Sequence, residues 1–342
     1  MTENDTKKQL PGILRFFIKL FQIILYIAIQ IIFIPIAIIG IIIAVYKEMG
    51  KSKKLGVSFS AIKALQYRWM MHYFNTRPDP ISVAFIKNFP CESHFGMWSV
   101  MGPLIISQRL FGFTTKLGKL VEPGEEAADS TAGIRVLMFD KVMEKYVDEM
   151  EQIVLPGAGF DLMTLQFTKG KKIKVFELDQ DNTLNVKVET LKKAGIEHDW
   201  ITYIPVDYEN ESWVDNLLEA GFDKTKRTLF LWQSVSLYLE AELVKENLRE
   251  MADLCVDGSI IAQDFYSTVF SSGEYSKESK KFMSIIEKMG EPAKFGIDMS
   301  DDPKAAVESF LKECGLKMTE YIQFGEKLDI ETFYCIVEAE KL

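Results

Sequence analysis

Over its second half, the chain alternates short apolar runs with amphipathic segments. The runs at 153–155, 174–178, 202–205, 228–231 and 259–264 have the length and composition of buried strands. Between them lie segments with apolar residues every three or four positions, which predict helices at 132–150, 162–168, 183–194, 212–220, 241–255, 275–289 and 302–314. Strands that alternate with helices indicate a doubly wound α/β fold with a mostly parallel sheet. Two final strands, at 317–323 and 333–338, suit an antiparallel edge.

The first half of the chain has a different pattern. Residues 1–19 are polar and basic, whereas 20–46 are 27 residues without a charge. A bilayer core needs about 20 apolar residues of helix, and the small-residue cleavage site of a secretory signal is missing, so we expect 20–46 to be a membrane anchor. Residues 47–130 are expected to be a linker and a helical cap or lid, with a helix at 58–74, a turn at 77–80 and an exposed loop at 122–126. The α/β domain then occupies 131–342.

The flanks of the anchor do not decide its topology. Basic residues lie on both sides, at Arg15 and Lys19 before it and within 47–54 after it, so the positive-inside rule gives no clear orientation. The apolar run is too short for two spans. One tilted span, or an in-plane anchor such as a shallow hairpin bending near Pro35, both fit. We expect a membrane location with the α/β domain on the cytoplasmic side, and contact of 47–54 with anionic head groups.

Composition narrows the classes of function. The net charge of −9 gives no sign of the basic face that nucleic-acid binding needs. The cysteines are scattered and without a CxxC pair, which is typical of buried thiols in a reducing compartment. The histidines lack metal-ligand spacing, so no metal site is expected. These residues are Cys91, Cys255, Cys314 and Cys335, and His72, His94 and His198.

A glycine turn follows the first strand of the α/β domain. Gly157-Ala158-Gly159 comes directly after the run 153–155, and Asp161 follows two positions later. Glycines permit a tight turn and remove the Cβ atoms that would block a ligand. In open α/β sheets ligands bind at this end of the strands. The dinucleotide fingerprint requires a third glycine where this chain has Leu162, so a nicotinamide cofactor is disfavoured.

Acidic residues close the next two strands. Glu177-Leu178-Asp179 ends the second, and either carboxylate is placed to accept the hydroxyl hydrogens of a ribose. Asp207-Tyr208 ends the third, where Asp207 suits an adenine amine and Tyr208 the ring face; these residues suit a helix cap equally well. Together these ends favour a ligand with a ribose and an adenine, for which S-adenosylmethionine fits.

The chain resembles the leucine carboxyl methyltransferase-like family of class I S-adenosylmethionine-dependent methyltransferases over roughly residues 60–340. The matching pieces are Ile134-Arg135, Phe139-Asp140, Gly157-Ala158-Gly159-Phe160-Asp161, Glu177-Leu178-Asp179-Gln180, Val206-Asp207, Leu237-Tyr238-Leu239 and Phe295-Gly296-Ile297-Asp298.

The resemblance implies a role for each matched position. Arg135, which composition alone would leave as a surface arginine, would bind the methionyl carboxylate. Gly157 and Gly159 would form the floor under the cofactor, Glu177 would hold the ribose and Asp207 the adenine.

The chain departs from the family at two places on the active-site side. Where the family usually has a glutamate, this chain has Gln233, and Leu162-Met163 replaces a common Thr-Arg pair. A membrane-tethered binding module without catalytic activity is therefore a second interpretation.

Methyl transfer depends mainly on positioning, and an ionised carboxylate acceptor needs no general base. A hydroxyl acceptor needs a general base, for which Asp264 and Tyr266 are the nearest candidates. Gln233 is a further candidate for a catalytic residue. We expect O-methylation of a small molecule, lipid or protein at the membrane. The oligomeric state is not indicated by the sequence.

Overall fold

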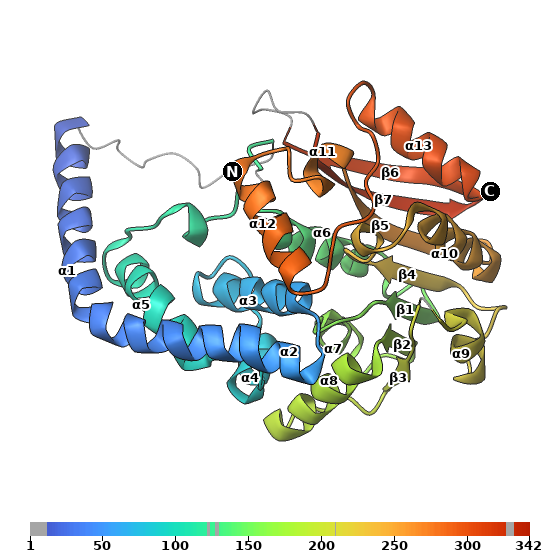
Figure 1. The fold of residues 1–342 in the computed structure, drawn as a ribbon, viewed down its shortest axis with the longest axis horizontal. Helices are drawn as coiled ribbons and strands as arrows, with labels where there is room; N and C mark the ends of the chain where they lie inside the picture. Colours follow the sequence, from blue (N-terminus) through green and yellow to red (C-terminus); the bar gives the residue numbers. More distant parts are fainter. Residues whose placement is uncertain (1–11, 122–123, 127–129, 209, 326–331) are drawn as a thin grey trace, which may run out of the picture.

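One mixed sheet forms the centre of the protein (Figure 1). The computed structural model describes residues 12–121, 124–126, 130–208, 210–325 and 332–342, and within these ranges seven strands lie in the order β3-β2-β1-β4-β5-β7-β6. Most of the expected polar N-terminus and part of the expected loop at 122–126 lie outside the described residues. The strands are β1 (Gln152–Pro156), β2 (Lys174–Asp179), β3 (Ile201–Pro205), β4 (Thr228–Trp232), β5 (Ile260–Tyr266), β6 (Leu316–Phe324) and β7 (Tyr334–Lys341).

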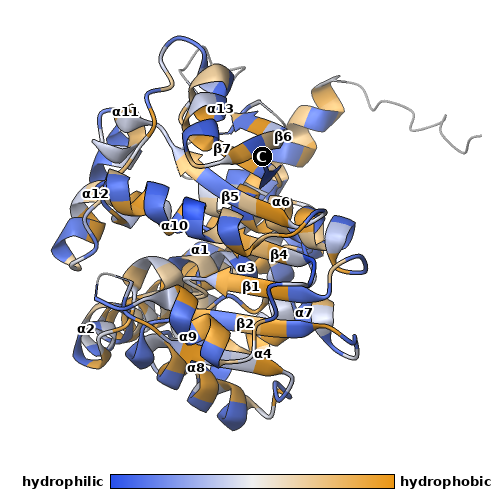
Figure 2. Ribbon diagram, turned by 90° about the vertical axis from the view of Figure 1, so that its right-hand side faces the viewer, coloured by the Kyte–Doolittle hydropathy of each residue, from blue (hydrophilic) through white to orange (hydrophobic). Residues whose placement is uncertain are grey.

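The strand directions agree with the predicted sheet. Strands β1 to β5 pair in parallel, and β7 runs antiparallel to both β5 and β6. Every residue of β1, β4 and β5 is buried, as expected of central strands covered on both faces. Figure 2 shows these strands as a hydrophobic centre between helices with polar outer surfaces. The mostly parallel sheet with an antiparallel edge is therefore confirmed.

Two hydrophobic clusters cover the two faces of the sheet. Along β1, Ile153 and Leu155 belong to one cluster, and Val154 to the other. This alternation follows from the two-residue period of a strand. The first cluster includes residues from the helices between positions 59 and 194 and from Lys277–Lys288, and the second includes residues from Trp213–Glu219, Ala241–Leu254 and Pro303–Glu313. The helices of the α/β domain are α6 (Thr131–Tyr146), α7 (Met163–Thr168), α8 (Asp181–Ala194), α9 (Trp213–Glu219), α10 (Ala241–Leu254), α11 (Thr268–Ser271), α12 (Lys277–Lys288) and α13 (Pro303–Glu313).

The segment before the α/β domain is mostly helical. The expected helix at 58–74 is present, whereas α4 and α5 were not predicted from the pattern. Both begin at a side-chain cap: Asp79 accepts a hydrogen bond from the Ser82 N–H (2.9 Å), and Ser93 from that of Gly96 (3.0 Å). The elements are α1 (Gly12–Val45), the π-helical turn η1 (Tyr46–Lys51), α2 (Ser52–Leu55), α3 (Phe59–Tyr73), α4 (Pro80–Asn88), α5 (His94–Phe111) and the short turn η2 (Lys116–Gly118).

The N-terminal helix α1 runs along one side of the molecule and is bent into two limbs (Figure 1). Pro35 lies inside it, and a proline removes a helical hydrogen bond and kinks the helix. Within the described residues, the helical run Gly12–Leu55 is the one that is long and apolar enough to cross a membrane.

Candidate active site

A cavity of about 1020 Å³ lies at the carboxyl ends of β1, β2 and β3. It is walled by these strand ends, by α2 and α3, and by the segment around α12. Among the residues predicted from the sequence, Glu177, Leu178 and Asp264 do not line it. Those that do are Arg135, Gly157, Ala158, Gly159, Asp161, Asp179, Asp207, Tyr208, Gln233 and Tyr266.

The glycine turn has a backbone that only glycine adopts easily. Gly157 has φ +70° and Gly159 has φ +49°. A Cβ on Gly157 would lie 2.3 Å from Cγ2 of Val235, which leaves no room for a side chain. The Gly157 N–H donates to the Tyr208 hydroxyl (3.0 Å), and the Gly159 N–H donates to Oδ2 of Asp179 (2.7 Å). The turn is thereby tied to the ends of the two neighbouring strands.

The two carboxylates at the end of β2 have different surroundings. Glu177 is fully buried, forms an ion pair with Lys187 on α8 (Oε2 to Nζ, 2.6 Å) and accepts a hydrogen bond from Thr164 on α7. Asp179 lines the cavity and accepts the N–H groups of Gly159 and Gln180 (2.8 Å). A carboxylate has about four lone-pair sites, so Asp179 keeps acceptor capacity toward the cavity beyond these two bonds. Of the two carboxylates, Asp179 is therefore the one that faces the cavity, whereas Glu177 is held in an internal ion pair.

The third strand end contributes Asp207 and Tyr208. Asp207 is half-buried, accepts a hydrogen bond from Asn210 (2.8 Å) and lines the cavity. The hydroxyl of Tyr208 reaches across to Gly157, so the ring lies over the end of the sheet. Burial raises the pKa of Tyr208 well above its ordinary value, so it is a neutral phenol at physiological pH.

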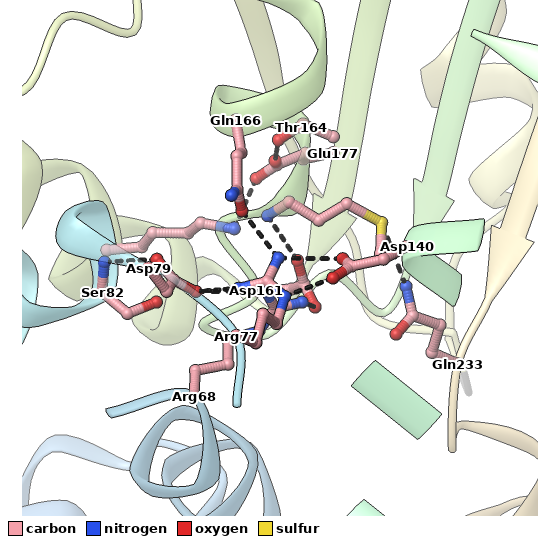
Figure 3. A network of polar contacts seen from close by, with 12 residues as sticks. Arg68, Arg77, Asp79, Ser82, Asp140, Asp161, Thr164, Gln166, Glu177 and Gln233 are labelled. Carbon is pink, nitrogen blue, oxygen red and sulfur yellow. Dashed lines mark hydrogen bonds and ion pairs between the residues drawn. The ribbon is translucent and has the colours of Figure 1, made fainter. Parts of the chain in front are cut away.

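Asp161 belongs to a buried network of charges that the sequence did not reveal (Figure 3). Its carboxylate accepts the Met163 N–H (2.6 Å) and pairs with Arg68 of α3 (2.6 Å). Burial alone would raise the pKa of Asp161, but Arg68 holds it below the ordinary value. The network continues through Asp79, Arg77, Asp140 and Gln166. It fastens the glycine turn to the helices that precede the α/β domain.

Arg135 projects from α6 into a second polar cluster. Its guanidinium donates to the Ser234 hydroxyl, and Ser234 has φ +51°, which is unusual for a residue other than glycine. Asp264 accepts the Ser234 N–H (2.6 Å), the Ser234 hydroxyl (2.9 Å) and the Tyr334 hydroxyl (2.8 Å). The strained serine is thus held by Asp264 and presents its hydroxyl to Arg135 beside the cavity.

The two candidate bases are poorly placed for proton abstraction. Asp264 is buried, does not line the cavity, and has both carboxylate oxygens engaged. Tyr266 lines the cavity, but burial and the neighbouring Asp264 raise its pKa to about 12. A group that remains protonated up to that pH cannot serve as a base at neutral pH. Neither residue is therefore placed to remove a proton from a ligand at neutral pH.

Both departures from the family pattern are visible in the structure. Gln233 lines the cavity and approaches the Met163 sulfur (3.8 Å). Leu162 and Met163 are buried in the hydrophobic core. The change at 162–163 is therefore accommodated by packing, whereas Gln233 alters the polarity of the cavity itself.

The opposite wall of the cavity comes from residues that sequence reasoning did not single out. Glu291, after α12, accepts the N–H groups of Phe59 (2.6 Å) and Ser60 (3.1 Å) at the start of α3. Glu48 forms an ion pair with Lys63. No local motif marks these positions, because the segments 48–67 and 278–294 meet only in the folded chain. Further lining residues of this kind are Met49, Ser52, Lys53, Tyr67, Phe270, Phe282, Ile285 and Met289.

The histidines take part in packing. His72 accepts the Asp79 N–H (3.0 Å), and His94 accepts the Trp69 indole N–H (3.0 Å). In the part of the chain that the structure describes, no three His, Cys, Asp or Glu side chains gather as a metal site would require.

Known proteins resemble this chain over the same region. Residues 109–252 match the leucine carboxyl methyltransferase family model, so the resemblance drawn from the motifs is confirmed for this segment. The segment contains Arg135, the glycine turn, Asp179, Asp207 and Gln233.

Two bacterial relatives cover parts of the chain. A protein of Mycolicibacterium gilvum is 31% identical over 117 residues, which are 34% of this chain and 38% of that protein. A protein of Mycobacterium ulcerans is 27% identical over 192 residues, which are 53% of this chain and 62% of that protein. The names of both provisionally assign them as S-adenosyl-L-methionine-dependent methyltransferases. The chain therefore spans less than two thirds of the length of either relative.

Among solved structures, magnesium protoporphyrin IX methyltransferase from Synechocystis PCC 6803 with bound SAH aligns with 65% of this chain and 90% of its own. The sequence identity is 11% and the TM-score is 0.41.

Proposed function

We propose that this chain, whose residues 109–252 match the leucine carboxyl methyltransferase family, is a membrane-anchored S-adenosylmethionine-dependent methyltransferase. The observation that carries the proposal is the convergence of the glycine turn, Asp179, Asp207 and Arg135 on one cavity. The volume of about 1020 Å³ is at the upper end of ligand pockets, which leaves space for an acceptor beside the cofactor.

The residues around the cavity fit this cofactor. The glycine turn lets a ligand lie against the backbone, and Asp179 has acceptor capacity for ribose hydroxyls. Asp207 suits an adenine amine, and the Arg135 guanidinium suits a carboxylate. S-adenosylmethionine, when bound, supplies an electrophilic methyl group. The chain contributes orientation and the exclusion of water, which are the main sources of rate in such a transfer.

The proposed reaction is O-methylation, with a carboxylate ahead of a hydroxyl acceptor. Asp264 does not line the cavity and both of its oxygens already accept hydrogen bonds, and Tyr266 is protonated at neutral pH, so neither supports proton removal from a hydroxyl. The apolar helix α1 supports an acceptor that is a small molecule, lipid or protein at a membrane. The proposal puts the α/β domain on the cytoplasmic side.

Two measurements test the proposal. Calorimetry on the purified, folded protein should show S-adenosylmethionine binding that is weakened by Asp207→Ala. Incubation with methyl-labelled cofactor and fractionated membranes should transfer label to a base-labile ester. Absence of binding by folded protein would refute the cofactor assignment.

A second candidate, a binding module that does not turn the cofactor over, is favoured by Gln233, which is uncharged where the family usually has glutamate. Cofactor binding without methyl transfer to any membrane fraction would support this candidate over the enzyme.

A further inference from the structure

The inward side of α1 packs on the protein along most of its length. Buried or half-buried positions recur every three or four residues, which is the spacing of one face of a helix. Measured along the bent helix at 1.5 Å per residue, the stretch from Gln22 to Lys47 is about 38 Å long. The inward positions include Gln22, Tyr26, Gln30, Phe33, Ala37, Gly40, Ala44 and Lys47.

The partner of this face is α5, and the two helices run antiparallel. At one end, Lys47 donates to the carbonyl oxygen of Glu92 (2.7 Å) just before α5. In the middle, Gly40 lies against Ser99 so closely that a Cβ on the glycine would overlap the Ser99 hydroxyl. At the other end, Gln22 donates to the carbonyl oxygen of Phe111 (2.6 Å). The chain is therefore attached to α5 and its flanks from Gln22 to Lys47.

Helix α5 is itself part of the folded body. Trp98 contacts Trp69 of α3 edge to face, with ring centroids 5.9 Å apart, and the Trp69 indole donates to His94 (3.0 Å). An α1 that crossed the bilayer upright would carry α5 and the adjoining part of α3 into the hydrocarbon. Helix α3 also carries Arg68, which forms buried ion pairs with Asp79 and Asp161.

A pair of spanning helices, α1 with α5, is also disfavoured. After Phe111 the chain must return to the body, where Glu126 accepts the Gly325 N–H (3.1 Å). The described residues of this return contain only the short turn Lys116–Gly118 as helix, and they include Lys116 and Lys119. Backbone without regular hydrogen bonds is not tolerated facing lipid.

From residue 20 onward, the outward face of α1 is apolar. Ile31, Ile32 and Ile42 are 61%, 69% and 65% exposed, and no charge interrupts residues 20–46. Basic residues flank both ends, as expected when both ends stay on the same side of the membrane. An isolated in-plane helix needs a polar face toward water. Here α5 covers that face instead.

From this geometry we propose that α1 lies in the plane of the membrane, with its outward face in one leaflet and both ends on the side of the α/β domain. The inference rests on the proposed membrane association and settles the topology that the sequence left open. It also sets the cavity beside the membrane surface, because α1 continues through η1 into the lining residues Glu48, Met49 and Ser52.

Single added cysteines test the topology. The four native cysteines are buried, so an impermeant maleimide should label the unmodified protein weakly. Lys19→Cys and Lys54→Cys place exposed thiols at the two ends of the apolar helix, and Lys224→Cys reports the side of the α/β domain. Each variant is expressed in bacterial cells and labelled in sealed right-side-out and inverted vesicles. Circular dichroism and labelling in detergent serve as controls for folding and thiol content.

We expect all three positions to be labelled from the same side and to equal extents. Labelling of Lys19→Cys from the side opposite to Lys224→Cys would overturn the in-plane arrangement while leaving membrane association intact. Recovery of the protein in the soluble fraction would overturn both. Neither result would affect cofactor binding measured by calorimetry, so failure of the topology and failure of the methyltransferase assignment are distinguishable.

Discussion

The buried pair of Glu177 and Lys187 provides a sharp test of which carboxylate at the end of β2 serves the cofactor. Both side chains are fully buried, and their charged atoms lie 2.6 Å apart. Lys187→Met removes the cation and keeps most of the side-chain volume. Glu177 then remains as a buried carboxylate that keeps the hydrogen bond from the Thr164 hydroxyl but has lost its cation.

The expected cost is large. At 2.6 Å and an effective dielectric constant of about 20, the attraction between the two charges is roughly 6 kcal/mol. Breaking a buried pair from one side typically costs about 3–5 kcal/mol of unfolding free energy. Proteins of ordinary stability have roughly 5–15 kcal/mol in total, so Lys187→Met should unfold far more easily than the parent. With a slope of about 3 kcal/mol per molar urea, the midpoint should fall by about 1 M or more.

A matched double variant isolates the charge. Glu177→Gln combined with Lys187→Met has no buried charge at this site, and the glutamine can still accept the Thr164 hydrogen bond. Urea denaturation should show that the double variant recovers most of the stability lost by Lys187→Met. Calorimetry should show S-adenosylmethionine affinity close to that of the parent protein, because Glu177 does not line the cavity.

Two outcomes would contradict this reasoning. Equal destabilisation of the single and double variants would mean that packing of the lysine stem, and not an unpaired carboxylate, sets the cost. A stable double variant that no longer binds the cofactor would return Glu177 to the binding site in place of Asp179.

Three further predictions concern the cavity. Gly157→Ala should abolish cofactor binding because the added Cβ meets Val235. The control is Gly170→Ala, since Gly170 has a similar φ of +77° but open space around it. This control should lose only the backbone strain, about 1–2 kcal/mol of unfolding free energy in urea denaturation. Tyr266 has a pKa of about 12, above its ordinary 10, so the folded state binds this proton more tightly than the unfolded state does. The free energy of unfolding should therefore fall as the pH rises from 10 to 12, by up to about 2–3 kcal/mol. The variant Tyr266→Phe should lose less stability over the same pH range. Gln233→Glu adds a carboxylate facing a cationic cofactor and should tighten S-adenosylmethionine binding roughly fivefold by calorimetry. Unchanged affinity would mean that the side chain at position 233 lies far from the positive charge of the cofactor.

The alternation of runs in the second half predicted the sheet well because each central strand is buried on both faces. Such strands read as continuous apolar runs, and β1, β4 and β5 are of this kind. Helices α4 and α5 were not predicted. Helix α5 is apolar on most sides because it lies between α1 and α3, so it has no regular polar face from which its period can be read.

The sequence predicted those residues of the candidate site whose place follows from their position at the end of a strand. Gly157, Asp179 and Asp207 each follow a strand, and parallel strands deliver their carboxyl ends to one edge. The same rule could not separate Glu177 from Asp179, because residues two apart share a side of a strand. What separates them is Lys187, which reaches Glu177 only when α8 packs on the sheet.

The connection between α1 and the cavity has a mechanical consequence. Helix α1, η1 and α2 follow one another without a break from Gly12 to Leu55, and α3 begins at Phe59. A membrane anchor joined by a long flexible linker would confine the enzyme to the surface but leave its cavity free to face any direction. Here the proposed anchor α1 continues directly into the cavity wall, and the ion pair of Glu48 with Lys63 adds a second link between η1 and α3. On the proposed membrane, the cavity therefore keeps a constant orientation and distance relative to the head groups, which suits an acceptor whose apolar part stays in the bilayer while its carboxylate enters the cavity.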